Sequence, residues 1–217
     1  MIKVFLNGSN GQMGQLIAKN IESYEDMQIV GRKDKSVFEN KEPFDVLIDF
    51  SLPEGSKEAF QIAKQNKAAF LCGTTNLSHN FIEALKQEKE IPVFCAPNVS
   101  IGVFLFGRLL KEAVQKYQDY NFALHEEHHS KKKDAPSGTA KSLAALIDFP
   151  QEKITYTRKG QVPGTHSLTI TSAAGDEEIL LQHKALDRNL FASSAVKIAR
   201  WLVNQKGGFY TMENFVK

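Results

Sequence analysis

Short apolar runs alternate with segments of helical periodicity through the first hundred residues. The apolar runs predict strands at residues 2–6, 28–31, 45–50, 68–71 and 92–95. Apolar positions three and four residues apart predict helices between them, including 54–66 and 80–89. The run 45–50 is almost continuously apolar, which is typical of a strand covered by helices on both faces. This alternation predicts a parallel sheet with right-handed crossover connections.

The pattern changes after residue 98. A long apolar helix is predicted at 101–114, and strands then dominate, at 122–125, 154–158, 166–173 and 178–183. Further helices are predicted at 137–147 and 192–203. We therefore predict an α/β protein. Residues 1–98, completed by 190–217, would form a Rossmann-like parallel-sheet domain that binds a nucleotide, and residues 99–189 an inserted α+β domain with a mixed sheet that binds substrate.

Composition and charge narrow the classes of function. The 217-residue chain is 42% hydrophobic and has a net charge of only +2, so it can form a real core and no nucleic-acid partner is expected. Cys72 and Cys95 lie in apolar stretches without metal-ligand spacing, which predicts buried thiols in a reducing compartment, the cytoplasm. The N-terminus does not resemble a signal peptide and no apolar run has membrane-spanning length, so neither export nor membrane binding is expected.

Three glycines separate the first predicted strand from the first helix. Gly8, Gly11 and Gly14 have the spacing G-x-x-G-x-x-G, not the commoner G-x-G-x-x-G. A glycine loop between a strand and a helix lets the backbone approach a pyrophosphate, whose charge the helix N-terminus favours. The context therefore favours a dinucleotide site over a plain turn.

A charged segment follows the second predicted strand. Asp34 lies twenty residues after Gly14, about where a dinucleotide fold places the acid that binds the adenine ribose, which would suit NADH. Arg32, Lys33 and Lys35 would instead pair with the 2'-phosphate of NADPH. The sequence leaves both cofactors open, and each residue also fits a polar hairpin.

The densest group of reactive side chains lies at residues 126–139. Histidines at 128 and 129 exchange protons near neutral pH, and the lysines at 131–133 supply positive charge, so this segment can bind and protonate an acid. A helix then begins, whose first N–H groups attract anions and which either Ser137 or Asp134 would cap. The alternative is a solvated basic loop.

The letters His125-Glu126-x-x-His129 also match the zinc-protease signature. That chemistry requires both histidines one turn apart on a helix. Residues 121–124 look like a strand, and Asp134, Pro136 and Gly138 follow soon after. We therefore expect no metal, and keep a zinc hydrolase as the lesser alternative.

Longer motifs resemble one family. The segment from Glu126 to Ala140 resembles the signature E-x-H-H-x-x-K-x-D-A-P-S-G-T-A of dihydrodipicolinate reductases. The other matching segments are Gly8-x-x-Gly11-x-Met13-Gly14, Asp45-Val46-x-Ile48-Asp49-Phe50-Ser51-x-Pro53-Glu54, Gly73-Thr74-Thr75, Ala96-x-Asn98-x-Ser100-x-Gly102, Val162-Pro163-Gly164 and Gly208-Phe209-Tyr210. The resemblance spans nearly the whole chain.

The resemblance implies an enzyme that reduces 4-hydroxy-tetrahydrodipicolinate to tetrahydrodipicolinate with NADH or NADPH, in the diaminopimelate route to lysine. It implies that His128 is the catalytic histidine and that Lys132 is the catalytic lysine that supplies a proton. His129, Gly138 and Thr139 would bind a substrate carboxylate. It also implies a homotetramer assembled through the sheet of the second domain, and cofactor contacts at Gly8, Ser9, Asn10, Gly11, Gln12, Met13, Asp34, Gly73, Thr74, Thr75, Ala96, Pro97, Asn98 and Val99.

Some features depart from the family pattern or leave alternatives. The stretch between Gly31 and Asp45 is short, which predicts an abbreviated adenosine pocket. Glu127 replaces a small residue beside His128. It would raise the pKa of His128 if it faced the site, and it would be inert if strand alternation turned it away. Cofactor in one half and substrate in the other imply closure before hydride transfer. A different nucleotide-dependent oxidoreductase and an inactive dinucleotide-binding regulator are the competing functions.

Overall fold

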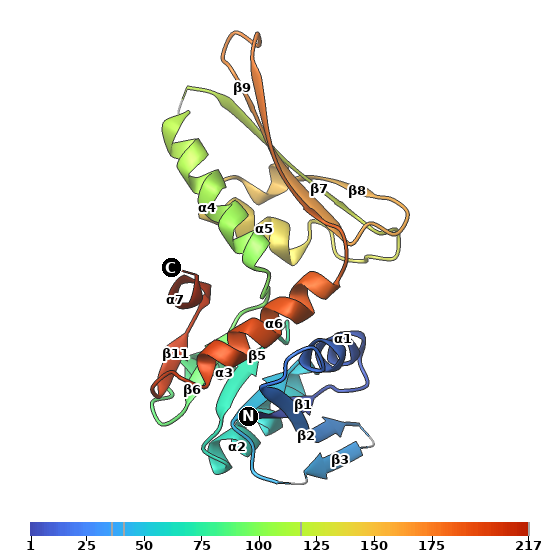
Figure 1. Cartoon of the computed structure of the whole chain (residues 1–217). Coiled ribbons are helices and arrows are strands. Elements are labelled where there is room, and N and C mark those ends of the chain that lie inside the picture. The colour runs from blue at the N-terminus through green and yellow to red at the C-terminus, as the bar shows by residue number, and fades with distance from the viewer. Residues whose placement is uncertain (36, 41, 118, 217) are drawn as a thin grey trace. The chain divides into compact units, whose positions relative to one another are not determined.

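The chain folds into two compact units. The computed structural model describes residues 1–35, 37–40, 42–117 and 119–216 (Figure 1). The first unit consists of residues 1–100 and 189–217, and the second of residues 101–188. The sequence placed these junctions within two residues of the same positions, at 98/99 and 189/190.

The first unit is built on a seven-stranded sheet with the order β11-β6-β5-β4-β1-β2-β3. Its strands are β1 (Ile2–Asn7), β2 (Met27–Asp34), β3 (Val37–Asn40), β4 (Val46–Asp49), β5 (Ala69–Cys72), β6 (Pro92–Cys95) and β11 (Gly208–Tyr210). All neighbouring strands are parallel except β3, which is antiparallel to β2. The parallel sheet predicted from the apolar runs is confirmed.

Helices cover both faces of this sheet. The face with Phe5, Leu47 and Phe70 packs against α2 (Pro53–Gln65) and α3 (His79–Lys86). The other face is covered by α1 (Gln12–Ile21) and α6 (Asn189–Leu202), which pack on each other (Figure 1). Burial of β4 on both faces explains its unbroken apolar sequence.

The two cysteines belong to this core. The expected burial is confirmed for Cys72, which is 0% exposed. Cys95 packs against the same core but stays partly exposed. Both thiols are free. A short helix, α7 (Met212–Phe215), follows β11.

The second unit is a four-stranded mixed sheet with the order β10-β9-β7-β8. Strand β7 (Asn121–His128) is antiparallel to β9 (Gly164–Thr171) and parallel to β8 (Thr155–Arg158), and β10 (Glu178–Ala185) is antiparallel to β9. Helices α4 (Ile101–Lys116) and α5 (Gly138–Leu146) contribute apolar side chains to its core, and η1 (Gln151–Lys153) precedes β8. The mixed sheet confirms the predicted fold class.

Several elements differ from the predictions in their bounds; for example, α6 begins at Asn189 and not at residue 192. Strand β2 runs to Asp34, beyond its predicted end at Gly31, and forms with β3 the polar hairpin that was the alternative for residues 32–35. Strand β7 continues to His128, three residues beyond its predicted end, because its inward polar residues find buried partners. Helix α3 ends at Lys86, not at residue 89. In the described part of the chain, no helix combines the length and apolarity needed to cross a membrane.

Candidate active site

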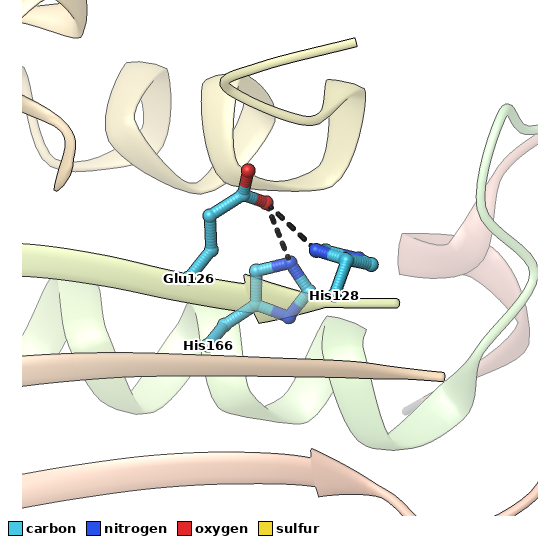
Figure 2. Close-up of side chains that lie close together, drawn as sticks. All are labelled: Glu126, His128 and His166. Carbon is cyan, nitrogen blue, oxygen red and sulfur yellow. Dashed lines mark ion pairs between the residues drawn. The ribbon is translucent and has the colours of Figure 1, made fainter. Parts of the chain in front are cut away.

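A buried acid and a buried histidine lie at the end of β7. Strand alternation turns Leu124, Glu126 and His128 to the buried face, where Glu126 is 0% and His128 7% exposed. His166 on β9 lies opposite Glu126 in the antiparallel register. Figure 2 shows the three side chains converging, with Glu126 Oε2 3.2 Å from His128 Nδ1 and 3.8 Å from His166 Nε2.

Glu126 is held as a carboxylate. Its other oxygen, Oε1, accepts hydrogen bonds from Arg158 Nη2 at 2.8 Å and from the backbone N–H of Ser137 at 2.9 Å. Burial raises the pKa of Glu126, but the close contact with His128 and the hydrogen bonds from Ser137 and Arg158 outweigh burial and hold that pKa well below its usual range. The acid therefore offers a fixed negative charge beside His128.

The neighbouring histidine is neutral. Burial is the main reason that the pKa of His166 falls to about 4, and the nearby His128 lowers it further. His183 on β10 lies opposite His166, and burial lowers its pKa as well. Both ring nitrogens of His166 are buried and have no hydrogen-bond partner among the described residues.

Gly164 makes room for the ring of His128. A Cβ atom on residue 164 would lie 2.9 Å from His128 Nε2, closer than real contacts allow. A glycine at this position therefore lets the imidazole take its place at the end of β7. The family motif contained Gly164, but nothing in the local sequence showed that it contacts His128.

The lysine-rich loop joins β7 to α5. Lys132 Nζ lies 2.7 Å from Asp134 Oδ1, and Arg158 Nη2 donates to the backbone oxygen of Asp134 at 2.7 Å. Lys132 is about one-fifth exposed, with 22% side-chain exposure, whereas Lys131 and Lys133 are exposed. Arg158 thus ties both the buried acid and the loop to β8.

Ser137 caps α5, which resolves the choice between Ser137 and Asp134. Its Oγ accepts the N–H of Ala140 at 3.1 Å. Gly138 and Thr139, the predicted carboxylate-binding pair, form the first turn of this helix. His129 follows the end of β7, with its Nε2 3.3 Å from Arg188 Nη2. The structure thus brings the predicted substrate-binding residues to one end of the second unit.

The zinc-hydrolase alternative is wrong. Residues 125–128 lie on a strand, so His125 and His129 are not one helical turn apart, and His125 and Glu126 point to opposite faces of the sheet. His125 Nδ1 lies 2.8 Å from Thr155 Oγ1 on β8. Glu127 also faces away from His128, which answers the question that strand alternation raised.

The first unit contains a cavity beside the glycine loop. It has a volume of about 690 Å³, and its lining includes Gly8, Asn10, Gly11 and Asp34. Gly8 has a φ of +78°, and a Cβ atom there would overlap the carbonyl oxygen of Phe50. Helix α1 begins beside this loop, with Gly11 as its N-cap and Gln12 and Met13 in its first turn. The loop and helix start have the shape of a dinucleotide cradle.

Asp34 closes the β2–β3 hairpin at the edge of the cavity. Its carboxylate accepts the backbone N–H groups of Lys35 at 2.7 Å and Asn10 at 2.9 Å, and these bonds lower its pKa. Lys33 forms an ion pair with Glu58, which also lines the cavity. The hairpin occupies the short stretch after Gly31, and Ser36 lies outside the described residues.

The remaining predicted cofactor residues lie outside the lining of this cavity. Gly73, Thr74 and Thr75 follow β5, and Ala96, Pro97, Asn98 and Val99 follow β6. Ser9 is buried beneath the glycine loop. These segments follow the carboxyl ends of parallel strands, where open α/β sheets bind ligands.

Asp49 connects several of these segments. It is 0% exposed, and its carboxylate accepts hydrogen bonds from Asn7, Ser51, Ser56, Cys72 and Thr74. Thr74 Oγ1 also accepts the N–H of Ser51 at 3.0 Å. Thr74, which follows β5, therefore links that strand to the end of β4 through Asp49 and Ser51. Its place in the family motif did not reveal this structural role.

Comparisons with known proteins agree with these features. The family models described as dihydrodipicolinate reductase, N-terminus, and dihydrodipicolinate reductase, C-terminus, match residues 32–99 and 102–216. The proteins called 4-hydroxy-tetrahydrodipicolinate reductase in Bdellovibrio bacteriovorus and Caldanaerobacter subterraneus subsp. tengcongensis are 38% and 32% identical. Those alignments cover 98% and 100% of this chain, and 95% and 99% of the relatives.

Solved structures show the same fold. A dipicolinate-bound dihydrodipicolinate reductase from Paenisporosarcina sp. TG-14 has a TM-score of 0.80 at 20% identity, with 100% of both chains covered. The DAP dehydrogenase of C. glutamicum in complex with DAP has a TM-score of 0.59 at 15% identity, over 97% of this chain and 92% of that one. Because relatives above 30% identity also span nearly its full length, the chain belongs to the dihydrodipicolinate reductase family.

Proposed function

We propose that the protein is a 4-hydroxy-tetrahydrodipicolinate reductase that uses a nicotinamide dinucleotide. The observation that carries this proposal is the fixed carboxylate of Glu126 beside His128, next to a lysine loop and a helix start, in a chain whose full-length relatives have that name. The same site is unsuited to zinc-dependent hydrolysis because its signature lies on a strand.

A dinucleotide fits the first unit. Gly8 and Gly11 line the cavity where a pyrophosphate would approach the backbone, and the start of α1 favours its charge. The Asp34 carboxylate would accept hydrogen bonds from a ribose, which favours NADH, while Lys35 in the same lining offers a cation for NADPH. Lys33 is already paired with Glu58, so we expect Lys35 to be the main contact for a 2'-phosphate.

The second unit would bind the dicarboxylate and handle protons. When bound, the cofactor supplies a hydride to the substrate. The N–H groups at the start of α5, together with His129, would hold a carboxylate there. Lys132, partly exposed and paired with Asp134, would donate the proton that balances the reaction, and Glu126 would stabilise His128 when that ring is protonated.

A coupled assay tests this proposal. The unstable substrate is generated in situ by its synthase, and the oxidation of NADH and NADPH is followed separately. We expect turnover with at least one cofactor. Binding of a dinucleotide without any turnover would instead support the inactive regulator.

Substitution of Lys132 tests the assigned proton donor. We expect Lys132→Ala to lose at least about 100-fold in kcat, the scale of general acid catalysis, with unchanged cofactor affinity. Lys131→Ala and Lys133→Ala are matched controls because both side chains are exposed neighbours on the same loop. Turnover of Lys132→Ala at the level of these controls would contradict the role of Lys132.

We also propose a place in the diaminopimelate route to lysine and a homotetrameric assembly. Both rest on family membership. Light scattering of the purified protein tests the assembly, and restoration of growth without diaminopimelate in a reductase-deficient bacterium tests the pathway.

A further inference from the structure

Glu126, His128 and His166 have the composition of a metal-binding triad as well as that of a proton-handling site. One ligand atom from each residue lies within 4.8 Å of the other two. The carboxylate and imidazole groups come from neighbouring antiparallel strands, so the sheet itself fixes their spacing (Figure 2). The triad differs from the helical zinc signature, with which it shares only Glu126.

The distances suit a tetrahedral ion. Zinc bonds of about 2.0–2.2 Å to nitrogen and oxygen place neighbouring ligand atoms about 3.3 Å apart in a tetrahedron. Glu126 Oε2 lies 3.2 Å from His128 Nδ1 and 3.8 Å from His166 Nε2. All three atoms lie within 4.8 Å of one another, so an ion would have to draw the two histidine rings slightly together.

The ligand atoms are also unusually poorly paired. Glu126 Oε2, His128 Nδ1 and His166 Nε2 are buried, and none has a hydrogen bond of good geometry to another described residue. Buried polar atoms normally find a partner, so these three leave a place for one. The side chains of Glu126, His128 and His166 are 0%, 9% and 5% exposed, which means that any partner is enclosed by protein.

The surroundings already orient the carboxylate. Arg158 and the N–H of Ser137 bind Oε1, which leaves Oε2 as the oxygen directed at the two rings. Such outer contacts to ligands are characteristic of metal sites. The Arg158 charge opposes a cation, so we expect moderate affinity and not the tight binding of a structural zinc.

We infer that Glu126, His128 and His166 form a binding site for a divalent transition-metal ion of the zinc class, and that the bound ion inhibits the enzyme by occupying His128. The ion would bind His128 Nδ1 in place of any proton there. The displaced proton would go to solvent, and no covalent bond of the protein would break. The inhibition rests on the proposed reductase function, whereas the binding does not.

Metal titration of the full-length protein tests the site directly. Protein freed of metal with a chelator is titrated with Co²⁺, whose visible absorption reports tetrahedral nitrogen and oxygen ligands, and with Zn²⁺ by calorimetry. We expect one equivalent to bind and the thermal midpoint to rise. His166→Gln removes one ligand and should weaken Zn²⁺ binding at least tenfold.

Two other histidines provide matched controls. His183→Gln alters the next ring in the same buried row, and His125→Gln alters the opposite face of β7. Both variants should bind Zn²⁺ as tightly as the wild type, and circular dichroism should show that all three variants are folded. Equal affinity of His166→Gln and the wild type, or no saturable binding by the wild type, would overturn the site.

The activity measurement is separate. In the coupled reductase assay, Zn²⁺ should inhibit the wild type over the concentration range in which it binds, and His166→Gln should resist inhibition by at least tenfold. The synthase must be shown to tolerate the same Zn²⁺. Binding without inhibition would overturn the effect on His128 and leave the site in place, whereas absence of any reductase activity would count against the proposed function alone.

Discussion

Protonation of His166 should destabilise the fold at mildly acidic pH. Burial lowers the pKa of this histidine to about 4, below its ordinary value of 6.5 in an unfolded chain. Between these two values the unfolded state binds more protons than the folded state, so the free energy of unfolding rises with pH across this window. Acidification from about pH 6.5 towards about pH 4 therefore lowers the free energy of unfolding.

The expected size follows from the shift. Each pKa unit corresponds to about 1.4 kcal/mol, so His166 alone should cost the fold about 3 kcal/mol as the pH falls through the window. The ring is 4% exposed, and solvent screening therefore does little to reduce this figure. The loss is large compared with the total stability of an ordinary domain.

Denaturation in urea at several pH values measures this effect. Far-ultraviolet circular dichroism follows unfolding of the wild type and of His166→Gln, in buffers with a chelator so that metal binding does not contribute. The variant should show a shallower pH dependence because its side chain does not titrate, and His125→Gln should keep the wild-type dependence. Parallel curves for the wild type and His166→Gln would refute the reasoning.

Three other substitutions test separate parts of the structure. Gly164→Ala should lower kcat at least tenfold with unchanged dinucleotide affinity, because the added methyl displaces the His128 ring; kinetics that match the wild type would contradict this. Asp49→Ala should lower the free energy of unfolding by about 3 kcal/mol or more, measured in urea, because it leaves several buried donors unpaired. Gly8→Ala should weaken dinucleotide binding at least tenfold in calorimetry, because the φ of +78° and the contact with Phe50 leave no room for a side chain. Gly175→Ala is the control for backbone strain alone, because Gly175 has a φ of +75° and open space around it.

The parallel sheet was predictable because its central strands are apolar on both faces. Strand β4 is fully buried, and its sequence therefore reads as one continuous run. The hairpin of β2 and β3 lies at the sheet edge, where charged residues such as Lys33 and Asp34 reach solvent or the cavity. Such residues carry no apolar pattern, and the local sequence therefore did not distinguish this edge hairpin from a segment that only binds a cofactor.

The site was only partly predictable for a different reason. His128 and Lys132 stand in a recognisable motif, and strand alternation correctly predicted that Glu127 faces away. The same alternation places Glu126 on the face of His128, so this partner was present as a signal in the sequence. Arg158 and His166 reach Glu126 from strands far along the chain, through a register that no local pattern encodes.

The charge balance around Glu126 explains how a carboxylate can stay buried beside His128, the residue to which we assign proton transfer. Removing an ion from water is costly unless a partner compensates it, and Arg158 supplies that partner at Oε1. The Glu126–Arg158 pair is neutral in sum, so neither partner is an unpaired buried charge. When His128 is protonated, Oε2 lies 3.2 Å from its Nδ1 and stabilises the imidazolium. His166, which stays neutral on the other side, adds no competing charge. The cluster thus places a fixed carboxylate beside His128, as the proton-exchanging role that we propose for this histidine requires.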